Sequence, residues 1–276
     1  MMTPDEVSSG GLPPARKPCQ NLDRSICSRT RACAVRTEVF VKVVIISDIH
    51  GNLSALEALP EKDFDQLWCI GDLVDYGPCP HEVVRWVKRT ATITVRGNHD
   101  HAAGLSVDPQ CSPPYKHLAA ETLRYTQTIC TEEDLRFLRN LEIQLETNVD
   151  ATRFYLVHAT PTDPLFGYCP ENSDRWENQV EWAGSDVLVV GHTHTPFIRH
   201  VGETIVVNPG SLGQPKTGRP LACYAVWADG HLSLKEYEYP IENTIRQIRT
   251  MPITEEDQDA LIVVLKTGFL PAGTSA

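Results

Sequence analysis

The sequence predicts an α/β fold built as one large unit, and two observations carry this prediction. Short β-branched runs alternate with segments of helical composition through the first half of the chain, and nearly every expected strand ends in a block of Asp, Asn, His and Gly. Such alternation is typical of βαβ units with right-handed crossovers and a largely parallel sheet. With 276 residues, of which 41% are hydrophobic and 22% charged, the composition excludes disorder, collagen and coiled coil.

The first half of the chain supplies strands and helices in alternation. The run Val43 to Ile46 is apolar throughout, which favours a central strand covered on both faces. Further strands are expected at 67–70 and 92–95, and helices at 52–59, 82–88, 114–129 and 131–141. Pro60 stops the first helix. Thr131 is suited to be an N-cap, because acidic residues follow it in the first helical turn.

The second half of the chain is richer in strand-forming residues. Strands are expected at 154–157, 187–190, 205–207, 221–227 and 232–237. Asp229-Gly230, between the last two, is a hairpin turn signal. Two helices, at 241–249 and 255–266, close the pattern.

Residues 1–40 differ from the rest of the chain. They contain four prolines and no hydrophobic periodicity, and their net charge of +2 leaves −13 for the remainder. We interpret them as a disordered tail or as a wrongly assigned start of a protein that begins near Val41. A transit peptide fits less well because acidic residues interrupt the segment, and the apolar stretch of a signal peptide is missing. Residues 41–240 are expected to form the main domain and 241–276 a helical extension packed on it.

Composition narrows the class of function. The sequence has no apolar run near the length of about 18 residues that spans a bilayer, which excludes an integral membrane protein. A net charge of −11 argues against a surface that tracks a long nucleic acid. The nine cysteines are an odd number without a CxxC pair, so we expect reduced thiols in a cytoplasmic protein, and neither a disulfide framework nor a zinc finger.

The polar blocks at the strand ends are the main functional signal. They begin at Asp48, Gly71, Gly97, His158, Gly191 and Asn208. Any one block is more often a capped turn or an ordinary histidine. The set is different, because parallel strands bring their carboxyl ends to one edge of the sheet, where open α/β sheets bind ligands. The mixture of carboxylate, amide and imidazole suits Zn²⁺, Mn²⁺ or Fe, and the lack of thiolate argues against a structural zinc site.

In order and spacing, the motifs DIH, GDLVDYG, GNHD, VHA and GHTH resemble the calcineurin-like metallophosphoesterase superfamily. GDLVDYGP together with GNHD and NPGSLGQP resembles its small bacterial and archaeal phosphodiesterase-like branch. The resemblance covers about residues 42–237. It implies a four-layer αββα sandwich of two mixed sheets, with a dinuclear metal site at the C-terminal ends of the strands.

The resemblance also implies two sets of metal ligands bridged by one carboxylate. The first set is Asp48, His50 and His194, the second is Asn98, His158 and His192, and the bridge is Asp72. We expect two divalent ions, with Mn²⁺ favoured and Fe, Zn or Ni as alternatives. Residues i and i+2 of an extended segment point the same way, so His192 and His194 are expected to face one pocket while Thr193 turns aside. Asp48 and His50 are expected to follow the same rule.

The chemistry follows from the charges of such a site. Two cations about 3.5–4 Å apart clamp a phosphoryl group and lower the pKa of a shared water, giving the hydroxide that attacks phosphorus. In the family pattern His99 is the acid that protonates the leaving group, with Asp75 to orient it; a capping or turn carboxylate is the alternative for Asp75. Arg96 is expected to contact substrate or to be a surface charge. Asn52 is expected to bind substrate at a helix N-terminus or to be an N-cap.

One position departs from parts of the family. Phosphoprotein phosphatases and dinucleoside tetraphosphatases carry Arg directly after the second acidic position, whereas Tyr76 stands there in this chain. The loop 208–219, with Ser211, Lys216 and Arg219, either supplies cations near the pocket mouth or is a solvated hairpin. The insert 101–150 is expected to cover the site, and His101, Tyr115 and His117 are its candidate pocket residues, although ordinary helix and loop side chains are commoner.

The sequence therefore predicts a metal-dependent phosphodiesterase that acts on a small phosphate ester, without long nucleic acid or membrane partners. A phosphomonoesterase and a phosphoprotein or dinucleoside polyphosphate phosphatase remain alternatives. A non-catalytic binding module of the same fold is disfavoured, because His99 and the whole ligand set are present. The physiological substrate and a homo-oligomeric state stay open.

Overall fold

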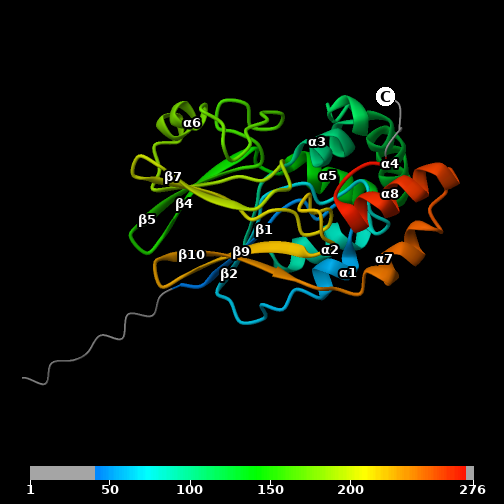
Figure 1. Cartoon of the computed structure of the whole chain (residues 1–276), viewed down its shortest axis with the longest axis horizontal. Coiled ribbons are helices and arrows are strands. Elements are labelled where there is room, and N and C mark those ends of the chain that lie inside the picture. The colour runs from blue at the N-terminus through cyan, green and yellow to red at the C-terminus, as the bar shows by residue number, and fades with distance from the viewer. Residues whose placement is uncertain (1–40, 272–276) are drawn as a thin grey trace, which may run out of the picture. The chain divides into compact units, whose positions relative to one another are not determined.

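The computed structural model describes residues 41–271, which form two stacked five-stranded sheets (Figure 1). The first sheet has the strand order β10-β9-β1-β2-β3 and the second the order β4-β5-β6-β8-β7. The strands of the first sheet are β1 (Val43–Ile46), β2 (Gln66–Cys69), β3 (Ile93–Thr94), β9 (Ala222–Ala228) and β10 (His231–Tyr237). Those of the second are β4 (Gln144–Val149), β5 (Thr152–Val157), β6 (Val187–Val189), β7 (Phe197–Val201) and β8 (Thr204–Asn208).

Both sheets are mixed, with a parallel centre that sets where the site lies. In the first sheet β1, β2 and β3 run parallel, and β9 and β10 add to β1 as an antiparallel hairpin. In the second sheet β5, β6 and β8 run parallel, with β4 and β7 antiparallel at the edges. The carboxyl ends of the parallel strands therefore lie at one edge of each sheet, and the polar blocks follow them.

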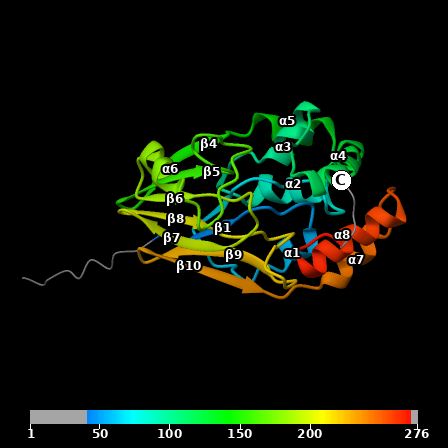
Figure 2. The ribbon, with the colours of Figure 1, turned by 45° about the horizontal axis from the view of Figure 1, so that its top comes forward.

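Three apolar clusters define four layers. The cluster between the sheets has Trp68 against Phe154 and Phe154 against Trp227, edge to face, with ring centroids 5.0 and 5.1 Å apart. A second cluster joins the other face of the first sheet to helices, and a third joins the second sheet to α6 (Trp176–Ala183) through the fully buried Trp176. In Figure 1 the second sheet lies above the first with α6 beyond it, and in Figure 2 the strands of the second sheet follow one another in their pairing order. The prediction of a four-layer αββα sandwich with two mixed sheets is confirmed.

The other helices pack on the first sheet or beside the strand ends. They are α1 (Leu53–Glu57), α2 (Pro80–Thr90), α3 (Asn98–Leu105), α4 (Lys116–Ile129), α5 (Glu132–Asn140), α7 (Ile241–Ile248) and α8 (Glu255–Thr267). A 3₁₀ turn at Pro113–Tyr115 precedes α4. Thr131 caps α5 as predicted, because its hydroxyl accepts the Asp134 N–H at 3.2 Å while the Asp134 carboxylate accepts the Thr131 N–H at 2.8 Å.

Several elements depart from the sequence expectations. Both edge strands of the second sheet, β4 and β7, and two helices, α3 and α6, were not predicted. The edge strand β4 has the sequence QLETNV, in which exposed residues alternate with half-buried ones. Most of these residues are polar, so the composition resembles that of a loop. Helix α3 begins inside the GNHD block, where the polar residues indicate a turn. The Asp229-Gly230 turn is confirmed, with both residues at positive φ, 52° and 76°.

The C-terminal helices α7 and α8 contribute Ile248, Leu261 and Leu265 to the cluster on the first sheet. The expectations for the tail at 1–40 lie outside the described residues. Within the described part of the chain the six cysteines are free, and none of its helices is both long and apolar enough to cross a bilayer.

Candidate metal centre

The side chains of the polar blocks are oriented by left-handed backbone conformations, and not by extended ones. Asp48, His50 and Asp72 have φ of 52°, 48° and 56°, and His192 and His194 have φ of 64° and 60°. The expectation that these residues lie in extended segments is wrong, although the side chains do converge. Each left-handed residue after a strand end turns the chain sharply, and such strained positions cluster at functional sites. Asp carries a short polar side chain that tolerates this region better than most residues.

Two glycines let the blocks approach one another. A Cβ at Gly97, the residue before Asn98, would overlap the carboxylate of Asp72. A Cβ at Gly191, the residue before His192, would overlap the hydroxyl of Ser47 and lie against the carboxylate of Asp48. The glycines of the GNHD and GHTH blocks are therefore required by packing at the site.

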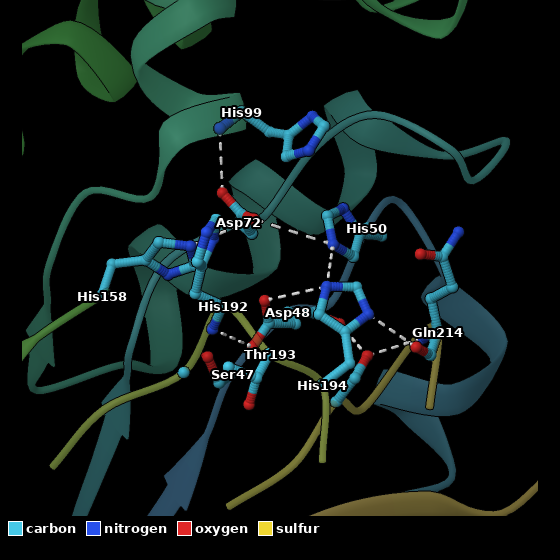
Figure 3. Close-up of polar contacts among 12 residues, drawn as sticks. Ser47, Asp48, His50, Asp72, His99, His158, His192, Thr193, His194 and Gln214 are labelled. Atoms are coloured by element: carbon cyan, nitrogen blue, oxygen red, sulfur yellow. Dashed lines mark hydrogen bonds and ion pairs between the residues drawn. The ribbon is translucent and has the colours of Figure 1, made fainter. Parts of the chain in front are cut away.

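The first ligand cluster joins Asp48, His50, Asp72 and His194, one ligand atom of each lying within 4.8 Å of the others (Figure 3). The Nε2 of His194 lies 3.2 Å from Asp48 Oδ1, and that of His50 lies 3.8 Å from Asp72 Oδ2. The Nε2 atoms of these two histidines are 3.1 Å apart. The carboxylates are fully buried or nearly so.

The second cluster joins Asp72, His158 and His192, so Asp72 belongs to both. The Nε2 of His158 lies 3.2 Å from Asp72 Oδ2. The Asn98 side-chain oxygen lies 3.2 Å from that Nε2 and 3.1 Å from His192 Nδ1, so Asn98 sits at the centre of this cluster. All seven predicted ligands are therefore brought together, in the two groups expected.

Hydrogen bonds to backbone carbonyls orient three of the imidazoles. The Nδ1 of His50 lies 3.0 Å from the Val74 oxygen, that of His158 2.7 Å from the Ile70 oxygen, and that of His194 2.7 Å from the Gln214 oxygen. An Nδ1–H donated to a carbonyl leaves a lone pair on Nε2. The two facing Nε2 atoms of His50 and His194 would then repel each other, and a cation between them removes this repulsion. A ring nitrogen that donates to a backbone carbonyl in this way is typical of metal-binding histidines.

The pKa values of three imidazoles fit the same interpretation, whereas His158 has to release a proton to bind an ion. Burial, followed by the charge of a neighbouring histidine or lysine, lowers the pKa of His50 and His194, and burial lowers that of His192 to about 3. Burial also acts to lower the pKa of His158, but the charge of Asp72 and its hydrogen bond outweigh burial and raise it to about 9. Neutral imidazoles and ionised carboxylates are the forms that bind divalent ions. The residues therefore fit a dinuclear His/Asp metal site.

His99 and Asp75 form a buried pair beside the first cluster, with the His99 ring centroid 5.1 Å from that of His50. The His99 Nδ1 lies 2.8 Å from Asp75 Oδ2, and the Thr126 hydroxyl donates to Asp75 Oδ1 at 2.7 Å. The backbone N–H of His99 donates to Asp72 Oδ1 at 2.9 Å, which ties the imidazole to the shared ligand. Burial alone would lower the pKa of His99, but Cys111, Asp72 and Asp75 around it raise that pKa well above its usual value.

A cavity of about 230 Å³ opens above Asp72, Asn98, His99, His192 and His194. Its other walls come from the loop after β2, the 101–150 insert, the 160s loop and the loop after β8. They are Tyr76, Gln110, Cys111, Ser112, Tyr115, Phe166, Tyr168, Gln214 and Lys216. A concave pocket with a few convergent polar groups is where a small ligand binds. Four of these nine wall residues are aromatic and four are polar and uncharged, and Lys216 is the one side chain with a formal positive charge among them.

Two predicted substrate-binding residues have structural partners and do not line this cavity. The Asn52 side chain accepts from the Ala55 N–H and the Thr244 hydroxyl and donates to the Gly213 oxygen and the Tyr239 hydroxyl, at 2.9–3.2 Å. It is the N-cap of α1, which is the alternative stated for it. The Arg96 guanidinium donates to the Arg139 backbone oxygen at 2.5 Å.

Of the remaining candidates in the loop and the insert, some have structural partners and others line the cavity. The Ser211 hydroxyl donates to the Asp48 backbone oxygen at 2.7 Å, and Arg219 is exposed and ion-paired with Glu236 at 2.7 Å. His117 pairs with Asp257 at 2.9 Å, and the His101 ring faces Phe166, with centroids 6.2 Å apart. Tyr115 does line the cavity.

Sequence reasoning gave no role to several residues at the site. The Asp100 carboxylate accepts the N–H groups of Asp72, Leu73 and Gly97 at 2.8–3.0 Å and so holds the β2 loop. Burial and the charge of Asp72 raise the pKa of Asp100 to about 7. The Cys111 thiol lies 3.3 Å from His99 Nε2, a contact across the insert that no local motif indicates. For Asp100, its place as the fourth residue of GNHD was the available signal.

Comparison with known proteins agrees with the fold and the ligand clusters. The model of the calcineurin-like phosphoesterase superfamily domain matches residues 41–229. The chain therefore belongs to the calcineurin-like phosphoesterase superfamily, and it is a metallophosphoesterase, a hydrolase of phosphoric ester bonds.

Among its relatives, phosphodiesterase YfcE of Escherichia coli is 30% identical over 208 residues, covering 70% of this chain and 91% of the relative. The uncharacterized protein MJ0912 of Methanocaldococcus jannaschii is 28% identical over 229 residues, covering 75% of this chain and 91% of that protein. The crystal structure of a metallophosphoesterase from Sphaerobacter thermophilus has a TM-score of 0.69 at 29% identity, covering 83% of this chain and all of the other. These matches place the chain in the YfcE/MJ0912-like branch of the superfamily.

Proposed function

We propose that this chain is a metal-dependent phosphodiesterase that hydrolyses a small phosphate ester. One observation carries the proposal: two His/Asp clusters share Asp72 directly below a cavity that also contains His99. In this proposal Asp48, His50 and His194 hold one divalent ion, Asn98, His158 and His192 hold the other, and Asp72 holds both. When bound, such an ion pair supplies a nucleophile at neutral pH and positive charge for the phosphoryl oxygens. Mn²⁺ is the proposed metal, with Fe, Zn or Ni as alternatives.

His99 is proposed to donate the proton that the leaving oxygen requires. Its imidazole borders the cavity, and its Nδ1 is held by Asp75, which is itself held by Thr126. The carboxylate keeps the ring orientation and favours a proton on the imidazole, while Nε2 faces the cavity side at Cys111. The geometry supports Asp75 as a positioning residue in preference to the turn carboxylate that was its alternative.

Two observations favour a diester as substrate. Tyr76 occupies the place at which related phosphatases carry Arg, so the bidentate guanidinium that suits a dianionic monoester is missing from this loop. The relative YfcE is named a phosphodiesterase. Relatives named bis(5'-nucleosyl)-tetraphosphatase match only about a fifth of this chain, for example 20% of it at 44% identity. A phosphomonoesterase remains the second candidate, because Lys216 does border the cavity.

The cellular setting is proposed from composition. The free cysteines of the described residues fit a reducing cytoplasm, and the excess of acidic residues disfavours long nucleic acid as a partner. Fractionation of cells that produce the protein tests the location. Elution of the pure protein against size standards tests whether it forms a homo-oligomer.

The decisive experiment compares two substrates with the same chromophore. Protein stripped of metal is reloaded with Mn²⁺, and kcat/KM is measured for bis(p-nitrophenyl) phosphate and for p-nitrophenyl phosphate. We expect hydrolysis of both only after reloading, and a higher kcat/KM for the diester. A reversed preference would make the chain a phosphomonoesterase, and activity that survives exhaustive chelation would contradict the metal-dependent mechanism.

A further inference from the structure

Lys216 is held at the rim of the metal centre by its own backbone. Its N–H donates to the backbone oxygen of His194 at 3.3 Å, and its neighbour Gln214 accepts from His194 Nδ1. The C-terminal end of α8 lies against the same loop, where a Cβ at Gly268 would contact the Lys216 Cα. The backbone of Lys216 is therefore held both by the loop that carries His194 and by the C-terminal end of α8.

The Lys216 ammonium has an aromatic neighbour and no acidic partner. Its Nζ lies 5.0 Å from the centroid of the Tyr115 ring, which is a cation–π distance. No carboxylate of the described residues lies within ion-pair distance of it, whereas Arg219, three residues further on, is paired with Glu236. Burial disfavours a cation that has no carboxylate within ion-pair distance, so this arrangement is suited to an anion that arrives in the cavity.

The loop after β2 does not supply that cation. Tyr76 stands in place of the arginine of related phosphatases, and its ring packs 4.9 Å from those of His50 and His99. Its hydroxyl donates to Cys111 Sγ at 3.4 Å, and the ring faces Tyr115 edge-on, with centroids 6.3 Å apart. The position is filled by an aromatic ring that is 6% exposed. The position of Tyr76 therefore offers the substrate no positive side chain.

Resting on the proposed function, we infer that Lys216 is the substrate-binding residue that pairs with a non-bridging phosphate oxygen, and that Tyr115 positions it. In this proposal the cation comes from the loop after β8 and not from the loop after β2. As a compact point charge, Lys216 holds a single phosphate oxygen, whereas an arginine fork would hold two. This accounts for a site that tolerates a diester with one negative charge.

Loss of Lys216 and loss of His99 should change kcat/KM in different ways across substrates. An electrostatic partner of the phosphate responds to the charge of the phosphate, so loss of Lys216 should harm a dianionic monoester more than a monoanionic diester. It does not transfer a proton to the leaving group, so the loss should be the same for aryl and alkyl leaving groups. For a proton donor the pattern is reversed.

The test compares Lys216→Gln, Lys216→Arg and the matched control Arg219→Gln in metal-loaded protein. For Lys216→Gln we expect kcat/KM to fall about 10- to 100-fold on p-nitrophenyl phosphate, as for a lost charge-assisted hydrogen bond, and by less on the diester. Lys216→Arg should recover most of the activity, since it retains the charge and the stacking on Tyr115. Arg219→Gln should match wild type, and metal content should be unchanged in all three.

A second readout keeps this test independent of turnover. Orthophosphate should raise the melting temperature of the metal-loaded wild type, and clearly less that of Lys216→Gln. Should wild type fail to hydrolyse any ester but show this difference, the proposed function would be wrong and the anion-binding role would stand. Equal stabilisation of both proteins, an unchanged kcat/KM in Lys216→Gln, or a loss that grows with the basicity of the leaving group would overturn the role of Lys216.

Discussion

The substitution His99→Ala tests how the leaving group is protonated. The ring is 4% exposed, borders the cavity and is held by Asp75 at 2.8 Å, so it presents a proton donor of fixed position. Positioned general acids contribute about 10²- to 10⁴-fold, which corresponds to about 3–5 kcal/mol of barrier. We expect a loss of this size in kcat/KM for a nucleoside or alkyl diester, because its leaving group is a basic alkoxide.

The aryl diester provides the internal comparison. Nitrophenolate is a stable anion that hardly needs a proton, so His99→Ala should cost distinctly less on bis(p-nitrophenyl) phosphate. The assay is the ratio of wild-type to variant kcat/KM on each substrate, with the alkyl ester products separated by chromatography. Metal content is measured in parallel, because Asn98 is adjacent and must remain a ligand.

A matched control lies on the same helix. His101 is two residues further along α3, its ring faces Phe166 and it does not line the cavity, so His101→Ala should leave both substrates unaffected. His99→Ala leaves the fully buried Asp75 with the Thr126 hydroxyl, so the melting temperature of the variant must be recorded. Equal losses on both leaving groups with intact metal content would refute the acid role and make His99 a phosphate-positioning residue.

Three further predictions follow from individual contacts. Asn52→Ala removes an N-cap and several buried hydrogen bonds, so we expect the free energy of unfolding, measured with denaturant, to fall by about 2–4 kcal/mol while KM stays unchanged. A raised KM at full stability would instead indicate that Asn52 contacts the substrate. Iodoacetamide should inhibit the enzyme by placing an adduct beside His99, and the residual activity of Cys111→Ala should be insensitive to it; equal inhibition of both proteins would contradict this. Deletion of residues 1–40 should leave activity and melting temperature unchanged, because both sheets and the site lie within 41–271, and a large drop in melting temperature would show a structural role.

The central strands and the helices around them could be predicted because the residues of each segment alone indicate its secondary structure. Val43 to Ile46 is buried at every position, which produces a continuous apolar run that only a covered strand explains. The edge strand β4 alternates between exposed and half-buried residues, and the register with β5 that makes it a strand is a non-local pairing. Its composition therefore carried too little information to separate it from a loop.

The residues of the two clusters could be predicted because they come in dense motifs, but the way they converge could not. The left-handed conformations of Asp48 and His192 are imposed by the strand ends and by close packing at Gly191, and composition does not report them. Lys216 and Tyr115 come from loops about 100 residues apart, so only the folded chain shows that they meet. Motifs thus located the metal chemistry, whereas the substrate-binding walls depend on tertiary structure.

The central claim is that two divalent ions share Asp72, and metal content measures it most directly. Wild-type protein reloaded with Mn²⁺ and freed of excess metal should retain two ions per chain by elemental analysis, in line with the two clusters that contain this carboxylate. Because the bridging charge offsets both cations, Asp72→Asn should lose both ions together, while substitution of a ligand to one cluster alone, such as His158→Ala, should leave one. Retention of two ions by Asp72→Asn, or full hydrolysis by protein shown to contain none, would contradict the account.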